Sequence, residues 1–73
     1  MITVLAFARY RDLLGFERID LPPAPSLDAL LADAHFAKLP KDALLAVNQA
    51  FADRTMDLKD GDEVALLPPV SGG

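Results

Sequence analysis

Two predicted strands, one near each end of the chain, are apolar on both of their sides. Apolar residues face both sides of each strand: Ile2, Val4 and Ala6 against Leu5 and Phe7 in the first, and Val64 and Leu66 against Ala65 and Leu67 in the last. Strands of this kind lie in the centre of a sheet and are normally covered on both faces. The rest of the chain must therefore supply cover for a sheet with two apolar faces.

Only one long amphipathic helix is available as cover. Ser26 is a good N-cap, and four apolar residues follow it at helical spacing: Leu27, Leu30, Leu31 and Ala34. We expect this helix to end before Pro40, because the residue ahead of a proline disfavours the helical conformation. One sheet face should then stay open and carry Phe7, Phe51 and Leu67. That face is a candidate partner-binding surface, although ordinary exposed hydrophobic residues or a minor core beneath a loop would give the same pattern.

Shorter elements complete the predicted order. They are a helical turn ending at Gly15, a strand over residues 16–21 that pairs with the first strand, a strand over residues 44–47, a turn at Asn48-Gln49 into a short strand at Phe51, and a turn at Asp60-Gly61-Asp62 before the last strand. This order favours an α+β fold of the β-grasp type, a mixed sheet of four to five strands on one main helix. We expect one domain over residues 1–67 and an extended tail over residues 68–73.

Composition excludes several classes of function. The chain has 73 residues, a formal charge of −4 and no cysteine. Its seven Lys and Arg residues are scattered, so it lacks the basic stripe that nucleic-acid binding needs. The only histidine, His35, fits a solvated or capping role, and Asp60, Asp62 and Glu63 fit a turn better than a metal site. Because no apolar stretch could span a bilayer and the first strand lacks a basic flank, we expect a cytoplasmic protein without bound metal.

The last six residues carry the most specific signal. Pro68-Pro69 ends the final strand and imposes an extended, stiff backbone. Gly72 and Gly73 have no packing use at a chain end, and glycine is entropically costly in an ordered segment. They become useful where the chain end must enter a narrow channel and present an unshielded carbonyl carbon. Taken alone, Gly-Gly is a weak signal, because an inert, frayed chain end would look the same.

Several segments resemble one family along the whole chain. The segment DGDEVALLPPVSGG at residues 60–73 is similar to the C-terminus of the small subunit of molybdopterin synthase. The segments VLAFAR at 4–9, RDLLG at 11–15 and AVNQ at 46–49 also resemble that family, in the same order. The connection over residues 36–44 is shorter than the family usually shows. This departure bears on local geometry and leaves the tail unaffected.

The resemblance implies a sulfur carrier with a ubiquitin-like β-grasp fold. A separate activating enzyme would use ATP to adenylate Gly73, and a sulfur-donor protein would then convert the acyl-adenylate to a thiocarboxylate. The tail, kept narrow by Gly72, would enter the large subunit and give its sulfur to the cyclic pterin precursor, forming the dithiolene of molybdopterin. The family's assembly has two small and two large subunits, and the small subunit binds no cofactor and is not catalytic alone. The partner contacts implied are Phe7, Phe51, Leu67, Pro68, Pro69, Val70 and Ser71.

Two alternatives stay open. The same tail would suit a sulfur carrier for thiamine synthesis, or a protein modifier joined to lysines through Gly73. A plain protein-interaction module with an inert tail belongs to a different class. Deleting Gly73 separates the classes, because only a carrier should lose all activity while it keeps its fold.

Overall fold

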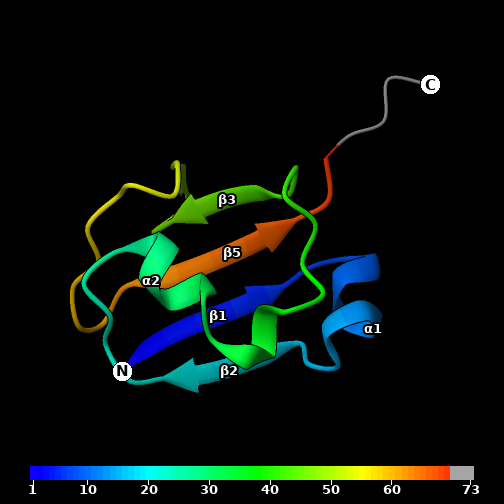
Figure 1. Cartoon of the computed structure of the whole chain (residues 1–73), viewed down its shortest axis with the longest axis horizontal. Helices are drawn as coiled ribbons and strands as arrows, with labels where there is room; N and C mark the ends of the chain where they lie inside the picture. Colours follow the sequence, from blue (N-terminus) through cyan, green and yellow to red (C-terminus); the bar gives the residue numbers. More distant parts are fainter. Residues whose placement is uncertain (70–73) are drawn as a thin grey trace.

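The chain forms a five-stranded mixed sheet packed against short helices (Figure 1). The computed structural model describes residues 1–69. The elements are β1 (Ile2–Ala6), α1 (Arg9–Leu14), β2 (Arg18–Leu21), α2 (Leu27–Leu31), the 3-10 helix η1 (Ala34–Phe36), β3 (Leu44–Val47), β4 (Ala50–Phe51) and β5 (Glu63–Leu67). The strand order is β2-β1-β5-β3-β4. The predicted α+β fold, with four to five strands in a mixed sheet, is confirmed.

The two strands that are apolar on both sides lie next to each other in the sheet. β1 and β5 pair in parallel, with Val4 opposite Val64, and β5 is followed in the sheet by β3, which is antiparallel to it. β2 pairs antiparallel with the outer side of β1, with Ile2 opposite Leu21. Both β1 and β5 therefore have strand neighbours on each side, as the apolar pattern predicts.

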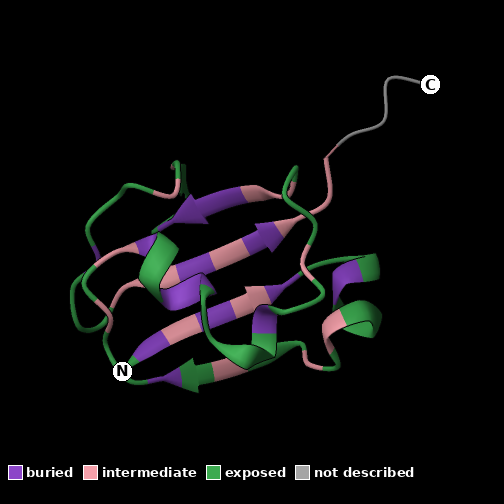
Figure 2. Cartoon of the chain, in the orientation of Figure 1, coloured by how far each residue is buried: buried purple, intermediate pink, exposed green. Residues whose placement is uncertain are grey.

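The core lies between the sheet and α2, which crosses one of its faces (Figure 1). Alternate residues of β1 and β5 are almost completely buried there: Ile2, Val4, Ala6, Val64 and Leu66. Their neighbours in sequence are only half-buried, and Figure 2 shows this alternation as bands along both strands. Full burial of one such Val, Ile or Leu side chain contributes about 1.5–3 kcal/mol. This face of the sheet therefore supplies most of the stabilising apolar burial.

The main helix is shorter than predicted. Ser26 caps it as expected, since its hydroxyl accepts a hydrogen bond from the Ala29 N–H at 3.1 Å, but α2 ends at Leu31. Ala34 is exposed and does not extend the apolar stripe. The cause is Asp33, whose carboxylate accepts the backbone N–H of His35 at 2.9 Å and starts the separate helix η1. A capping aspartate at this point ends one helix and begins the next.

The second strand also begins later than predicted. β2 starts at Arg18, because Phe16 leaves the line of the sheet and packs against the core. Its ring meets that of Phe36 edge to face, with centroids 6.0 Å apart, an arrangement that aromatic pairs favour. The predicted pairing with β1 is confirmed. β1 itself ends at Ala6, one residue earlier than expected.

The chain leaves the sheet at the end of β5. Leu67 is the last residue of that strand, and Pro68 and Pro69 follow it. Val70, Ser71, Gly72 and Gly73 lie outside the described residues. The division into a domain over residues 1–67 and a tail over residues 68–73 therefore stays a prediction.

Candidate functional site

The sheet face opposite α2 carries a shallow apolar hollow, which we name the open-face hollow. Side chains from four strands or their ends surround it: Phe7, Ala46, Gln49, Phe51, Ala65 and Leu67. Its volume is about 220 Å³. Phe7 is 41% exposed and Phe51 is 78% exposed, so two phenylalanines stand in solvent beside one depression. Exposed apolar side chains gathered in this way mark interaction sites.

Strand pairing brings these residues together. Ala65 and Leu67 alternate along β5 with the buried Val64 and Leu66, so they point away from α2. Ala46 pairs with Ala65 on one side and with Phe51 on the other. Directly opposed residues share a face of the sheet. The small Ala46 and Ala65 thus form a floor between the larger side chains of the lining, which explains why the surface is hollowed there.

A tight hairpin positions Phe51. Asn48 and Gln49 have φ values of 50° and 71°, the left-handed conformations of a two-residue type I′ hairpin loop. The predicted turn is confirmed, and its length fixes the register so that Phe51 faces the open side. The Asn48 side chain anchors the loop to the start of β5: its amide donates to Asp62 at 3.0 Å, and its carbonyl oxygen accepts the Glu63 N–H at 3.0 Å.

Phe7 lies at the opposite side of the hollow, just past the end of β1. Its N–H donates to the Leu66 carbonyl at 3.1 Å, and Ala8, with φ of 51°, then turns the chain into α1. Because β1 and β5 are parallel, Phe7 and Leu67 both stand at the C-terminal ends of their strands. Pro68 and Pro69 follow Leu67 and are half-buried. The open-face hollow therefore adjoins the point where the chain leaves β5.

Within residues 1–69, none of the residues that line the hollow is titratable. At the far end of β5, hydrogen bonds from the Asn48 side chain and from the Lys59 N–H, at 2.8 Å, lower the pKa of Asp62. The backbone N–H and the ring of His35 likewise lower the pKa of Asp33, which agrees with the capping or solvated role expected for this histidine. The lining of the hollow can thus bind an apolar partner but offers no general acid or base.

Residues 1–69 contain neither a candidate metal-binding cluster nor a candidate membrane-spanning helix. No cluster of three His, Asp or Glu side chains there could hold a metal ion. None of the helices in that part of the chain is long and apolar enough to cross a membrane.

The structure brings together three of the residues that sequence reasoning named, namely Phe7, Phe51 and Leu67. Their role in partner binding stays a prediction. Ala46, Ala65 and Gln49 were missed, because small or polar residues carry no signal until strand register places them between the larger side chains. Pro68 and Pro69 follow Leu67 but do not line the hollow, so their role in partner binding also stays a prediction. Val70, Ser71, Gly72 and Gly73 lie outside the described part of the chain.

Comparison with known proteins gives a consistent result. The chain is 40% identical to the molybdopterin synthase sulfur carrier subunit of Escherichia coli (strain K12) over 81 positions, covering 100% of both chains. It is 28% identical to one chain in the complex of subunits 1 and 2 of molybdopterin-converting factor from Helicobacter pylori 26695, with a TM-score of 0.72, covering 99% of this chain and 97% of that one.

A third similarity is to SAMP1 from Haloferax volcanii, with 26% identity, a TM-score of 0.71, and coverage of 99% of this chain and 98% of that one. The family model described as ThiS family matches residues 4–73. This match extends over nearly the whole chain, and the fold of the matched neighbours is the one observed here. The chain therefore belongs to the ThiS family.

Proposed function

We propose that this chain is a sulfur carrier subunit of molybdopterin synthase and that the carboxyl group of Gly73 is its working group. One observation carries the proposal: a protein of that name from Escherichia coli matches the chain over the full length of both. The Pro68-Pro69 and Gly72-Gly73 pairs support it, because a stiff spacer followed by a bare chain end suits entry into a partner's active site.

The chemistry requires an activated carboxyl group, since a carboxylate is ionised at neutral pH and is a poor electrophile. An activating enzyme would direct the Gly73 carboxylate at the α-phosphorus of ATP, so that an acyl-adenylate forms and pyrophosphate leaves. A persulfide sulfur of a donor protein would then attack the carbonyl carbon and expel AMP. A second thiol would cleave the resulting acyl disulfide and release the thiocarboxylate. With no cysteine, the chain has no thiol side chain that could carry the sulfur instead.

Docking would use the open-face hollow. Phe7, Phe51 and Leu67 offer an apolar surface beside the start of the tail, so a partner seated there would receive the tail directly. The Helicobacter pylori neighbour is a complex of subunits 1 and 2, which supports a large subunit as the partner. An assembly of two small and two large subunits, a separate activating enzyme and a cytoplasmic location belong to the same proposal.

Intact-mass measurement tests the carrier role. The chain is incubated with an activating enzyme of the family, ATP and a persulfide donor, and fragmentation locates any change. We expect one oxygen to be replaced by sulfur at Gly73, and no change in a variant that lacks this residue. An unchanged mass, with an activating enzyme that modifies a known carrier in parallel, would reject the proposal.

A second candidate function is protein modification, which the similarity to SAMP1 favours because SAMP1 is a small archaeal modifier protein. Both functions need an activated Gly73, but they differ in the product. A modifier forms an isopeptide bond to a lysine, whereas a carrier releases its sulfur and regains a free carboxylate. Tracing an isotope-labelled chain in cells separates them, since only a modifier yields stable conjugates of higher mass. A sulfur carrier for thiamine synthesis would instead fail to support conversion of the cyclic pterin precursor.

A further inference from the structure

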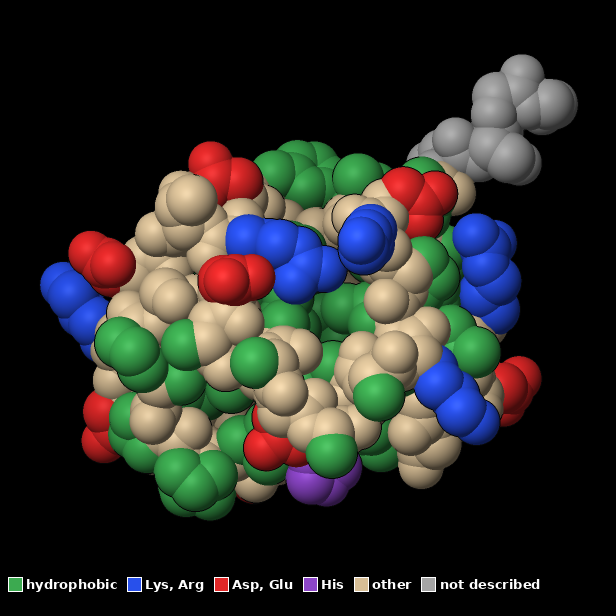
Figure 3. Space-filling model, in the orientation of Figure 1, with side chains coloured by type: hydrophobic (Ala, Val, Ile, Leu, Met, Phe, Trp, Pro, Cys, Tyr) green, Lys and Arg blue, Asp and Glu red, His purple; other side chains and the backbone are tan. Residues whose placement is uncertain are grey.

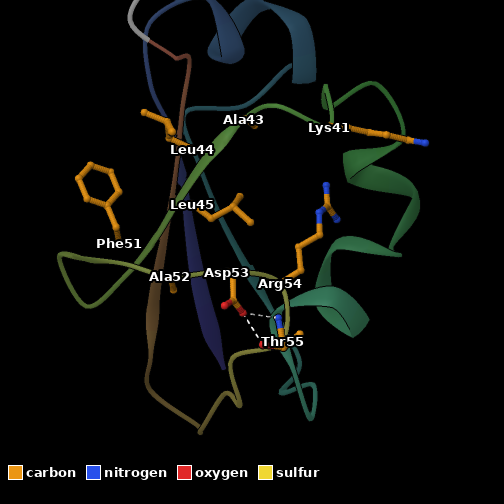
Figure 4. Close-up of a pocket in the computed structure, with 9 residues that line it drawn as sticks. All are labelled: Lys41, Ala43, Leu44, Leu45, Phe51, Ala52, Asp53, Arg54 and Thr55. Carbon is orange, nitrogen blue, oxygen red and sulfur yellow. Dashed lines mark hydrogen bonds between the residues drawn. The ribbon is translucent and has the colours of Figure 1, made fainter.

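A second hollow lies at the β3 edge of the sheet, and we name it the edge groove (Figure 4). Its volume is about 520 Å³. It is bordered by residues 43–45 at the start of β3, by Phe51, and by the segment 52–55, with Lys41 at its rim. Only Phe51 also lines the open-face hollow. The edge groove is therefore a largely separate surface.

The groove exists because β3 has a neighbour along only part of its outer edge. β4 contains just Ala50 and Phe51, and the Ala52 N–H makes one more bond, to the Leu45 carbonyl at 2.9 Å. The chain then turns away. Asp53 accepts the Thr55 N–H at 2.8 Å, and the Arg54 carbonyl accepts the Asp28 N–H of α2 at 2.9 Å. The first part of β3 is thus left as a sheet edge.

Within the described residues, two backbone groups on this edge face the groove without a hydrogen-bond partner. The Leu45 N–H points to the same side as its carbonyl, yet within residues 1–69 no bond runs from it to Ala52. The Ala43 carbonyl likewise accepts no hydrogen bond within that range. The Ala43 carbonyl and the Leu44 N–H belong to one trans peptide and so point in opposite directions. Because the Leu44 N–H faces β5, the Ala43 carbonyl faces the groove. Unpaired edge groups of this kind are templates for another strand.

The charge of the groove is opposite to that of the chain. The formal net charge is −4, but Lys41 and Arg54 line this site, and Figure 3 shows neighbouring Lys and Arg side chains on this face of the molecule. The third charged lining residue, Asp53, is engaged by the N–H and hydroxyl of Thr55. Arg54 lies 3.7 Å from Asp28, an exposed pair that is weak in water. The guanidinium can therefore take a further carboxylate.

The side chains divide the groove into two halves. In Figure 4, Leu45 and Arg54 point into the space between β3 and the helices, whereas Leu44 and Phe51 point to the other side of β3. A strand added beside β3 would alternate in the same way. A residue level with Leu44 would meet apolar side chains, and the residue before it would lie near Lys41. The residue after it would turn out of the sheet beside Ala52, which already bonds the Leu45 carbonyl, and would lie near Arg54.

We propose that the edge groove binds an extended acidic segment of a partner protein as a parallel strand beside β3. The central residue of that segment donates its N–H to the Ala43 carbonyl and accepts the Leu45 N–H, the pattern of a parallel ladder. This residue is apolar, and both of its neighbours are acidic. Binding here needs neither the tail nor its activation.

An NMR titration with a defined probe tests the proposal. The probe is the acetylated and amidated peptide Val-Glu-Val-Glu-Val, added to the isotope-labelled full chain. We expect the largest amide shift at Leu45, further shifts over residues 53–55, and slower hydrogen exchange of the Leu45 N–H. Methylating the nitrogen of the central valine removes the donor to Ala43 and should weaken binding roughly tenfold or more, as should replacing both glutamates by lysine.

Two protein variants complete the test. Arg54→Gln should weaken binding of the probe severalfold, whereas Phe7→Ser, which changes only the open-face hollow, should leave it unchanged. The peptide comparisons use the unaltered chain, so they hold even if a variant folds poorly. Absence of a shift at Leu45, or equal binding of the methylated or lysine peptides, would overturn the proposal. In all of these experiments Gly73 keeps its free carboxyl group. Failure of this proposal is therefore distinguishable from failure of the proposed carrier function.

Discussion

Leu67, the last residue of β5, lies directly opposite Leu44, the first residue of β3. This pair separates two surfaces, since Leu67 lines the open-face hollow and Leu44 lines the edge groove. The chain also leaves the sheet here, immediately before Pro68. Substitutions at Leu67 can therefore show whether the open-face hollow takes part in docking, separately from any effect on folding.

Leu67→Arg should weaken docking to a molybdopterin synthase large subunit by at least tenfold, about 1.4 kcal/mol. The arginine would place an unpaired charge in an apolar contact, which is costly when water is excluded. Isothermal titration calorimetry against the large subunit measures the change. Circular dichroism and urea unfolding show whether the domain stays folded, which we expect because Leu67 is only half-buried.

Leu13→Arg is the matched control. Leu13 is 39% exposed on α1, outside the open-face hollow, and the substitution adds the same charge. Its affinity for the large subunit should equal that of the unaltered chain. Equal affinities of Leu67→Arg and Leu13→Arg for the large subunit would show that the open-face hollow is not part of the docking surface.

Leu66→Ala and Leu67→Ala should differ strongly in stability although the two residues are neighbours. Leu66 is completely buried against the core, so its truncation should cost about 2–5 kcal/mol. Leu67 is half-buried on the open face, and its truncation should cost less than about 1 kcal/mol. Urea unfolding of both variants gives the two values. Similar losses would mean that the open face carries a second core within the domain.

The sequence predicted the sheet well because β1 and β5 are apolar on both sides. Few sheet arrangements can bury such strands in a chain with one long amphipathic segment. The pattern therefore predicts that both strands lie in the centre of the sheet. Helix length could not be predicted in the same way. The apolar spacing of Leu27, Leu30, Leu31 and Ala34 continues past Leu31, but the side chain of Asp33 competes for the backbone and ends the helix.

Tyr10→Phe should leave the free energy of unfolding unchanged or raise it by up to about 1 kcal/mol. Tyr10 is 1% exposed, and its hydroxyl has no hydrogen-bond partner within residues 1–69. Removing a buried polar group without a partner relieves its desolvation cost while the ring keeps its packing. Urea unfolding measures the difference, with Tyr10→Ala as a control that should lose about 3–5 kcal/mol. A loss of about 1 kcal/mol or more in Tyr10→Phe would show that the hydroxyl is bonded.

The candidate site was predicted only where large apolar residues mark it. Phe7, Phe51 and Leu67 stand out because they lie on the face that the helix does not cover. The edge groove had no such signal. Lys41 and Arg54 are 13 positions apart in the chain and look like scattered surface charges until β3 and the segment 52–55 bring them to one edge. The Leu45 N–H lacks a partner among residues 1–69 because of how the strands pair, and strand pairing cannot be read from a single sequence.

Stability should fall in acid because hydrogen bonds lower the pKa of four loop or turn aspartates. For Asp62 the donors are the Asn48 side chain and the Lys59 N–H, and the other three are Asp33, Asp53 and Asp60. In the unfolded chain these carboxyls return to an ordinary pKa of about 3.9, so the unfolded state binds more protons as the pH approaches that value. The stabilisation is therefore complete near neutral pH and is lost as the pH falls below about 3.9 and through the lowered folded pKa values.

Asp62→Asn isolates one of these contributions. The variant should be less stable than the unaltered chain at neutral pH, and the difference should shrink as the pH falls, because protonation removes the same charge from Asp62 that the substitution removes. Urea unfolding at constant ionic strength, at neutral pH and at several values below pH 5, measures it. Ser26→Ala is the control: it removes the cap of α2 without changing a titrating group, so its deficit of about 1 kcal/mol should hold at every pH. A difference for Asp62→Asn that stays constant with pH would contradict this account. It would mean that the variant loses stability because an amide replaces the carboxyl group, and not because the charge is lost.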